Sequence, residues 1–465
     1  ERHEALRTVF PDVDGQPYQD IRPAAEARPG MTVEAITEAD LADAVDRAVR
    51  HSFDLATELP LRASLFTIAD HEHVLVLVIH HIAGDGWSMG PLARDLSTAY
   101  TARRTGTAPT WSPLPLQYAD YTLWQRELLG DENTPDSLLA TQIDYWKNAL
   151  AGLPERVELP TDRPYPEQAG YDGASVPVRV DAELHQALTA LARSSRTTVF
   201  MVLQAALGVL LHRLGAGTDI PIGTPVAGRG EEELDDLVGF FVNTLVLRTD
   251  LSGDPTFTEL LDRVRETDLN AYAHQDIPFE SLVEAVNPTR SLAHHPLFQV
   301  TLAFNNTPPT SVDFPAVDAL REFADVKAAR MDLTVNLAER HGEDGSPHGI
   351  DGVITYRTDL FEQDTVTALV ERLLQVLRAV TDTPGRRIAS VDVLSEDERH
   401  LLLEEWNDTA KPVPPATVPE LFQHRVRQTP DATALVADGV HITYEDLNAR
   451  ANRLARLLTE RGVGP

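Results

Sequence analysis

The sequence has no cysteine among its 465 residues. It can therefore form no disulfide framework, no thiolate nucleophile and no zinc–thiolate site. Long apolar runs are also missing, since a run such as Val74 to Ile79 is far too short to span a bilayer. Because no signal-peptide pattern opens the sequence, we expect a soluble protein of a reducing compartment, the cytoplasm.

Positive charge is scarce. Lysine and arginine together number 40 against 72 aspartates and glutamates, which gives a formal net charge of −32. Nucleic acids and anionic membranes both attract basic surfaces, so neither is an expected partner. The hydrophobic share of 42% is that of a folded globular protein, and the acidity is interpreted as a solvated surface.

A strand, a short polar loop and a helix are predicted in succession near residue 80. The run Val74 to Ile79 consists of valine, leucine and isoleucine, which predicts a strand buried on both faces. The loop His80 to Gly86 contains two glycines, and a helical pattern begins at Ser88 and continues to Tyr100. Loops held by a strand and a helix are common places for a functional site.

The middle of the chain mixes helical and strand patterns. Residues 159–174 are rich in proline and glycine, which indicates a linker between two lobes. The patterns beyond it predict a helix over 182–194 and an unusually apolar helix over 199–214 that is buried on most sides. They also predict strands over 219–226, 298–304 and 352–356. Asp254 followed by Pro255 predicts another helix start, and the apolar stripe of that helix is Phe257, Leu260, Leu261 and Val264.

The last part of the chain has the character of an unfinished domain. Residues 409–417 are rich in proline and predict a linker. After them the patterns predict a helix over 418–427, a strand over 433–436, a hairpin turn at Asp438-Gly439 and a helix capped by Thr443. This segment is too short to enclose a core of its own, so we expect the beginning of a larger domain.

The sharpest local feature is a pair of histidines, His80 and His81, followed by Asp85 and Gly86. Neighbouring side chains on an extended backbone point to opposite faces, which argues against one metal ion bound by both imidazoles. A histidine accepts a proton near neutral pH, so one ring would act as a base while the other packs. Asp85 is either a catalytic partner or, as we favour, a charge that fixes the loop to an arginine. Gly86 lets a substrate oxygen approach its backbone N–H.

Five motifs occur in order between residues 2 and 280. They are RHEALRTVF (2–10), HHIAGDG (80–86), YADYTLW (118–124), VGFFVNTLVLR (238–248) and HQDIPFE (274–280). They resemble the RHExLRTxF, HHxxxDG, YxDYxxW, VGxFVNTxxxR and HQDxPFE motifs of nonribosomal peptide synthetase condensation domains. Residues 442–448 (ITYEDLN) and 451–455 (ANRLA) resemble the opening of an adenylation domain, without its phosphate-binding or substrate-pocket motifs.

The sequence departs from the family in two places. The family's last core motif reads RDxSRNPL, whereas residues 290–297 read RSLAHHPL and keep Arg290 and the final Pro-Leu. Arg290 and Arg7 are therefore the expected ion-pair partners of Asp85, and His294 and His295 inherit no role. The family's first motif would precede residue 1, so we expect a domain that is truncated at its start.

The resemblance implies an α/β fold of two chloramphenicol-acetyltransferase-like lobes, each with α+β layers, arranged as a V around a central tunnel. The loop from His80 to Gly86, called the signature loop below, would lie at the floor of that tunnel. The expected boundaries are an N-lobe over 1–160, an interlobe linker over 161–174, a C-lobe over 175–395, a second linker over 396–417 and an adenylation fragment over 418–465.

The resemblance also implies the reaction. Donor and acceptor carrier proteins would each deliver a thioester on a phosphopantetheine arm, and the acceptor amine would attack the donor carbonyl to form a peptide bond. No metal and no cofactor of the chain's own is expected. His81 would orient the amine and accept its proton, and the Gly86 N–H would contact the thioester oxygen. The expected supporting or substrate-binding residues are His80, Trp87, Ser88, Asn243 and Asn306.

Other members of the same fold, and one other class, stay open as alternatives. An epimerisation domain shares the two histidines but carries a later glutamate motif that is missing here. A heterocyclisation domain has aspartates in place of His80 and His81, and a chain-releasing domain would not be followed by an adenylation start. The alternative from another class is a non-catalytic, condensation-like platform that recruits other proteins. Such a platform is expected to lose the signature.

Overall fold

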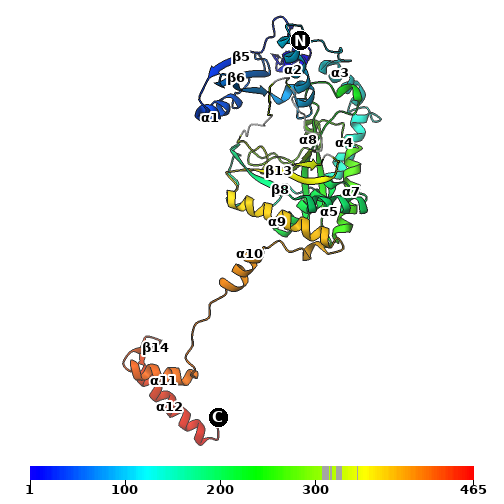
Figure 1. Cartoon of the computed structure of the whole chain (residues 1–465). Helices are drawn as coiled ribbons and strands as arrows, with labels where there is room; N and C mark the ends of the chain where they lie inside the picture. The colour runs from blue at the N-terminus through cyan, green and yellow to red at the C-terminus, as the bar shows by residue number, and fades with distance from the viewer. Residues whose placement is uncertain (306–313, 315–316, 321–326, 343, 465) are drawn as a thin grey trace. The chain divides into compact units, whose positions relative to one another are not determined.

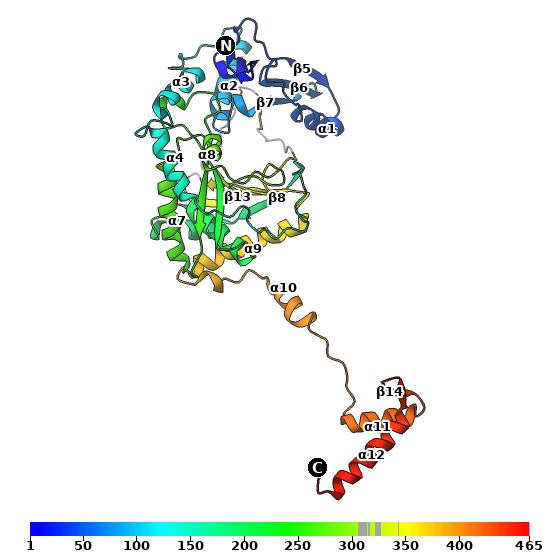
Figure 2. The ribbon, with the colours of Figure 1, turned by 180° about the vertical axis from the view of Figure 1, so that it is seen from behind.

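The structure, a computed structural model, describes residues 1–305, 314, 317–320, 327–342 and 344–464. The chain divides into two compact units, Glu1–Leu394 and Ser395–Pro465 (Figures 1 and 2). The lobes and linkers expected from the sequence are a finer division than these two units.

The first part of the larger unit leads into the signature loop. Its elements are η1 (Glu4–Arg7), β1 (Thr8–Val9), β2 (Asp12–Val13), β3 (Gln16–Pro17), β4 (Asp20–Ile21), β5 (Met31–Ala35), α1 (Glu38–Val49), β6 (Leu61–Ala69), β7 (Glu72–Ile79), η2 (His81–Ala83), α2 (Met89–Arg104), α3 (Tyr118–Leu129) and α4 (Leu138–Ala149). β5 pairs in parallel with β6, which pairs antiparallel with β7, and α1 packs against β6 and β7 (Figure 1).

The strand expected at Val74 to Ile79 is present as β7, but it is not buried on both faces. Leu75 and Leu77 are 43% and 38% exposed, and they alternate with half-buried valines. An antiparallel strand of a small sheet commonly packs one face and leaves the other in solvent. An unbroken apolar run gives no sign of this difference, so the prediction of two-sided burial was wrong.

The second part of the larger unit is built on a six-stranded mixed sheet. Its elements are β8 (Gly173–Val180), α5 (Ala182–Ser194), α6 (Val199–Arg213), β9 (Asp219–Val226), η3 (Glu232–Leu234), β10 (Asn243–Asp250), α7 (Phe257–Tyr272), α8 (Phe279–Val286), β11 (Val300–Asn305), β12 (Leu333–His341), β13 (Pro347–Arg357), α9 (Gln363–Asp382) and η4 (Ile388–Ser390). The strand order is β10-β9-β11-β12-β13-β8, and β11 runs parallel to both neighbours.

The main core lies between this sheet and its helices. α5, α6, α7 and α9 pack on one another and on the strands, and residues Met201 to Leu211 of α6 are all buried, as its apolar sequence predicted. Within the described residues, no single helix is both long and apolar enough to cross a bilayer. The bent pair of α5 and α6 passes that length and composition test together.

α7 begins two residues later than the sequence suggested. Asp254 lies in the left-handed region with φ of 51°, and Thr256 caps the helix. The Thr256 hydroxyl accepts a hydrogen bond from the Glu259 N–H (3.3 Å), and the Glu259 carboxylate accepts one from the Thr256 N–H (2.7 Å). This reciprocal capping box satisfies two unpaired donors, which explains why it replaces the expected Asp254 cap. The predicted stripe from Phe257 to Val264 is buried.

The smaller unit contains α10 (Glu396–His400), the π-helical turn η5 (Leu401–Glu405), α11 (Val418–Gln428), β14 (Thr433–Ala437), β15 (Val440–Thr443) and α12 (Tyr444–Glu460). Asp438 and Gly439 both have positive φ and join β14 to β15, and Thr443 caps α12, as predicted. None of the described residues of α11, β14, β15 or α12 is buried. A segment of this size cannot enclose a core.

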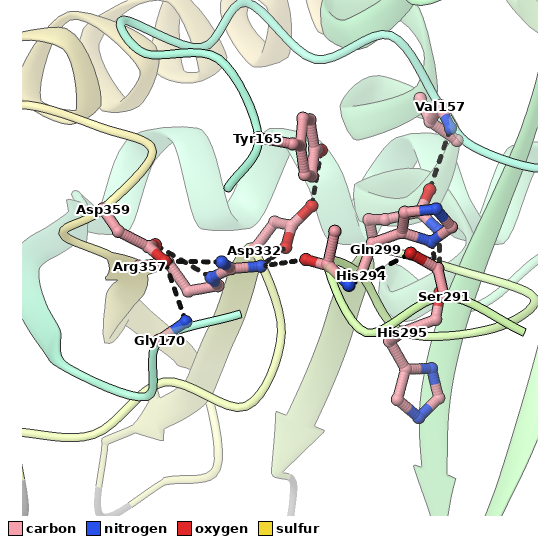
Figure 3. Close-up of polar contacts among 11 residues, drawn as sticks. Val157, Tyr165, Gly170, Ser291, His294, His295, Gln299, Asp332, Arg357 and Asp359 are labelled. Atoms are coloured by element: carbon pink, nitrogen blue, oxygen red, sulfur yellow. Dashed lines mark hydrogen bonds and ion pairs between the residues drawn. The ribbon is translucent and has the colours of Figure 1, made fainter. Parts of the chain in front are cut away.

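A buried arginine ties the end of β13 to the 290–297 segment (Figure 3). Arg357 is 1% exposed, and its guanidinium donates to Asp332 Oδ1 (3.0 Å), to both carboxylate oxygens of Asp359 (2.9 and 2.6 Å) and to the Ala293 carbonyl (2.8 Å). One cation thus satisfies two carboxylates and a backbone carbonyl, which is the condition under which charge is tolerated in a core.

The same cluster fixes the segment that leads into β8. The Tyr165 hydroxyl donates to Asp332 Oδ2 (2.6 Å), and the Gly170 N–H donates to Asp359 Oδ2 (2.9 Å), as Figure 3 shows. Burial raises the pKa of Tyr165 and that of Asp332. Two residues of the predicted interlobe linker are therefore held on the sheet by part-buried polar contacts.

Replacement of Arg357 by alanine should destabilise the larger unit strongly. Loss of the guanidinium leaves Asp332 and Asp359 without their cation, and breaking a buried pair in this way costs about 3–5 kcal/mol. Urea unfolding followed by tryptophan fluorescence measures the change. The control is Arg378→Ala, which removes an exposed partner of Asp181 and should change stability by less than about 1 kcal/mol. Equal effects of the two substitutions would contradict a stabilising role for the buried Arg357 guanidinium.

A second buried polar group lies between α6 and α7. Asp268 and Gln204 are fully buried, and Gln204 Nε2 donates to Asp268 Oδ1 (3.1 Å). Asp268 Oδ2 and Gln204 Oε1 have no hydrogen-bond partner among the described residues. A proton on Oδ2 would turn the carboxylate into a donor suited to an amide oxygen. Burial raises the pKa of Asp268 to about 7.

The stability of the larger unit should therefore depend on the protonation of Asp268. Its pKa is higher in the folded chain than the ordinary 3.8, so its stabilising contribution is complete below about pH 4 and is lost as the pH rises through 7. Asp268→Asn stays neutral and should unfold at higher urea concentration than the wild type at pH 8, with the difference vanishing or reversing at pH 5. The control is Asp262→Asn, an exposed position of the same helix. A pH-independent difference would refute the raised pKa.

Candidate active site

The signature loop starts where β7 ends. His80 caps the short helix η2, and its Nδ1 accepts a hydrogen bond from the Ile82 N–H (3.1 Å), which leaves the ring proton on Nε2. The half-buried ring of His80 also packs edge-on against Phe53, with centroids 5.9 Å apart. Burial and the neighbouring His81 lower its pKa. His80 therefore supports the loop, and its ring stays neutral.

His81 is in a different environment. It is exposed, and its ring has no hydrogen-bond partner among the described residues. Its imidazole packs against Phe240 in a T-shaped contact, with centroids 5.0 Å apart and planes at 76°. Both ring nitrogens are thus available to a molecule that enters the site.

Asp85 is the anchor of the loop. Its side chain is fully buried, and Oδ1 accepts hydrogen bonds from the N–H and the hydroxyl of Ser88 (both 2.8 Å). Oδ2 accepts one from the Phe241 N–H (3.0 Å), 156 residues further along the chain. A carboxylate enclosed in this way cannot touch a substrate, so the structure gives Asp85 a fixing role and not a catalytic one.

The arginine that pairs with Asp85 is Arg229, and the prediction of Arg290 and Arg7 was wrong. Arg229 Nη2 lies 3.4 Å from Asp85 Oδ1, and its side chain is 5% exposed. Arg290 is exposed, and Arg7 pairs with Glu4 at 3.0 Å. Arg229 is distant from Asp85 in sequence, and the path by which the chain brings the two together cannot be predicted from the spacing of the motifs.

Arg229 also packs against an aromatic ring. Its guanidinium carbon lies 4.1 Å from the centroid of the Phe241 ring, a cation–π contact, and it donates to the hydroxyl of Ser88 at 3.0 Å. Burial lowers the pKa of Arg229, and the charge of Asp85 acts against that shift. The glycines on both sides of Arg229 were a signal for a constrained turn. At Gly228 a Cβ would lie 1.9 Å from the Phe241 carbonyl oxygen.

Gly86 faces the open side of the loop. It is exposed, and its N–H has no hydrogen-bond partner among the described residues. A Cβ built at this position would meet no atom within 4 Å. Packing therefore gives no reason for a glycine here, and the space that a side chain would fill is open to a substrate.

The remaining predicted residues have supporting roles or lie outside the described part. Ser88 is fully buried, and its hydroxyl contacts Asp85 and the Gly239 carbonyl (2.8 Å each), so it supports the loop and does not bind substrate. Trp87 is half-buried. Asn243 holds the 275–279 turn: Nδ2 donates to the carbonyls of Gln275 (2.8 Å) and Ile277 (2.7 Å), and Oδ1 accepts from Phe279 N (3.0 Å). Asn306 lies outside the described residues.

Tyr118 makes a hydrogen bond to the 238–248 motif whose partner the sequence did not predict. Its hydroxyl donates to the Phe240 carbonyl (2.6 Å), and burial raises its pKa. A Cβ on Gly239 would lie 2.3 Å from the Tyr118 ring, so this glycine is required by close packing. The YADYTLW and VGFFVNT motifs lie far apart in sequence, so their positions gave no reason to expect a contact between Tyr118 and Phe240.

Two cavities delimited by described residues lie away from the signature loop. One of about 390 Å³ lies beside the end of α4, and one of about 630 Å³ lies beside the start of α1. Neither is lined by the signature loop, so the contacts and exposure of the loop locate the site, and the expected tunnel stays a prediction. Among the described residues, no group of three potential ligands is arranged to hold a metal ion.

Family and sequence comparisons agree along the whole chain. The family model described as "Condensation domain" matches residues 1–403, and the model for AMP-binding enzymes matches residues 422–465. A dimodular nonribosomal peptide synthase of Bacillus subtilis is 50% identical over 464 residues, which are 100% of this chain and 20% of that protein. An isonitrile lipopeptide synthase of Mycobacterium tuberculosis is 50% identical over 471 residues, 100% of this chain and 19% of that protein. The chain thus spans about a fifth of the length of these relatives.

Solved structures give the same fold. The X-domain from teicoplanin biosynthesis is 40% identical, with a TM-score of 0.80 over 84% of this chain and 87% of that one. A four-domain nonribosomal peptide synthetase, bound to AMP and glycine, has a TM-score of 0.78 over 99% of this chain and 35% of that one. At 24% identity that likeness concerns the fold alone. The larger unit has the chloramphenicol-acetyltransferase-like fold that the motifs implied. The chain belongs to the condensation-domain family of nonribosomal peptide synthetases, and it continues into the start of an AMP-binding enzyme domain.

Proposed function

We propose that this condensation domain catalyses aminolysis of a thioester. The α-amine of an acceptor aminoacyl thioester attacks the carbonyl carbon of a donor peptidyl thioester. A C–N bond forms, the C–S bond breaks, and the peptide is lengthened on the acceptor. The proton lost by the amine is balanced by the proton that the departing thiolate gains.

His81 is the residue we assign to that proton. Its exposed imidazole orients the attacking amine, takes the proton as the C–N bond forms, and delivers it to the leaving sulfur. The Gly86 N–H donates to the carbonyl oxygen as negative charge develops on it. The observation that carries this proposal is that the His81 imidazole and the Gly86 N–H, both without a partner among the described residues, are exposed on a loop whose Asp85 side chain is fixed inside the fold.

We propose that both substrates arrive on carrier proteins, an upstream donor and a downstream acceptor, each through a phosphopantetheine arm. Holding two tethered reactants in one site converts a bimolecular step into an effectively unimolecular one, which supplies much of the acceleration. The AMP-binding start at residues 422–465 supports an assembly in which an adenylation domain follows in the same polypeptide.

Recruitment without catalysis is the alternative to test alongside. The X-domain that resembles this chain is also known in a complex with OxyB, which makes docking of another protein a property of that relative. The chain keeps His81, Asp85 and Gly86, which favours catalysis. Binding of carrier proteins without acyl transfer would support recruitment instead.

Replacement of His81 by alanine should lower the rate of peptide-bond formation by about 10²–10⁴-fold, the usual contribution of a positioned acid–base group. The measurement mixes donor and acceptor thioesters on carrier proteins with the chain and follows the acceptor by intact-protein mass spectrometry. His71→Ala, at an exposed position before β7, is the matched control and should leave the rate unchanged. A His81→Ala rate equal to that of wild type would leave the imidazole without a chemical role.

Gly86→Ala separates substrate access from folding. Because no atom lies near the added methyl group, the melting temperature should stay within about 1 °C of wild type. The rate should fall by about tenfold or more, since the methyl group occupies the space beside the N–H. Gly385→Ala, where a Cβ also meets no atom within 4 Å, should affect neither property. An unchanged rate for Gly86→Ala would exclude close substrate approach at this position.

The loop anchor predicts opposite results for two arginines. Arg229→Met removes the cation beside buried Asp85, so it should lower both the melting temperature and the rate of peptide-bond formation, with a stability loss of about 3–5 kcal/mol. Arg290→Met, at an exposed position, should change neither. Thermal unfolding and the carrier-protein assay provide both readouts. If Arg290→Met were the more damaging change, the Asp85–Arg229 pair would not be the anchor.

A further inference from the structure

Phe240 lies directly beside the proposed base. Its ring meets the His81 imidazole in a T-shaped contact at 5.0 Å, yet the residue is still 37% exposed. A phenylalanine that only fills a core is normally buried, whereas Phe240 is partly in solvent and contacts an imidazole.

The backbone around Phe240 is fixed without help from its side chain. The Phe240 carbonyl accepts from the Tyr118 hydroxyl (2.6 Å), the next N–H, that of Phe241, donates to Asp85 (3.0 Å), and the preceding N–H, that of Gly239, donates to Ser88 (3.1 Å). The 238–239 and 240–241 peptide units are therefore held by polar contacts, and those made by Gly239 and Phe241 are buried. These contacts fix the backbone position from which the Phe240 ring extends to His81.

His81 needs such a neighbour. A histidine base is ordinarily oriented by a hydrogen bond that its second ring N–H donates to a carboxylate or carbonyl oxygen. His81 makes no such bond among the described residues, and the nearest acid in sequence, Asp85, is fully engaged with Ser88, Phe241 and Arg229. The contact with Phe240 is the one aromatic contact of its ring in the described part of the chain.

We propose that Phe240 is a positioning residue that orients the His81 imidazole for proton transfer. This role rests on the function proposed above. A T-shaped contact between an aromatic ring and an imidazole restricts rotation about the Cβ–Cγ bond and shields one side of the ring from water. Without the phenyl ring, His81 samples other rotamers, and only a fraction of them direct a nitrogen at the amine.

The kinetic test compares three substitutions in the full chain. Phe240→Ala and Phe240→Leu both remove the aromatic ring, and each should lower the single-turnover rate by about tenfold while the acceptor KM stays within about twofold. Phe240→Tyr keeps the ring and should restore the rate to within about twofold of wild type. A rise in KM with an unchanged turnover rate would instead make Phe240 a substrate contact and overturn the positioning role.

A double substitution shows whether Phe240 acts through His81. If it does, Phe240→Ala added to His81→Ala should cause no further loss of rate. A further tenfold loss in that background would overturn the proposal. Tyr171→Ala, which removes an exposed aromatic side chain elsewhere, should change neither background.

Nuclear magnetic resonance gives a readout that is independent of turnover. The ring proton shifts of His81 should carry a ring-current contribution in wild type and in Phe240→Tyr, which is lost in Phe240→Ala and Phe240→Leu. Absence of that contribution in wild type would overturn the contact itself. Absence of peptide-bond formation by wild type would overturn the proposed function and this role with it. A rate lost in His81→Ala but kept in Phe240→Ala would overturn the positioning role alone.

Discussion

The buried carboxylate of Asp85 is the constraint on which the candidate site depends. It accepts hydrogen bonds from Ser88 and from Phe241, and it lies beside Arg229. A charge removed from water is tolerated only where donors and a counter-charge surround it, so the carboxylate specifies where both chain segments must lie. The signature loop and the 238–241 segment are joined by this one group.

The buried contacts of Asp85 hold the loop with His81 and Gly86 on its exposed side. Asp85 and Ser88 are engaged in buried hydrogen bonds, whereas the His81 imidazole and the Gly86 N–H of the same loop have no partner in the described part of the chain. An acid in contact with His81 would hold a proton or a charge near it, whereas here the neighbour is the ring of Phe240. The contact that the His81 ring makes in the described part of the chain is thus one of packing and not of charge.

The sequence predicted the elements that have a regular period or a local cap. The stripe from Phe257 to Val264, the buried helix α6 and the turn at Asp438-Gly439 depend on neighbours within a few residues, and all three are present. The sequence did not predict contacts between distant segments. The expected partners of Asp85 were Arg290 and Arg7, whereas the observed one is Arg229, because a motif gives residue types and not the path of the chain between motifs. The two-sided burial expected for β7 failed for the same reason, since burial depends on what packs against a strand.

The most direct measurement of the account is a crystal structure of the chain with a non-hydrolysable aminoacyl-phosphopantetheine analogue. We expect the amine of the analogue within about 3 Å of a ring nitrogen of His81, with the carboxylate of Asp85 still hydrogen-bonded to Ser88 and Phe241. An amine bound away from His81, or an Asp85 side chain turned out toward the analogue, would contradict the central claim that the loop is fixed by its aspartate and reacts through its histidine.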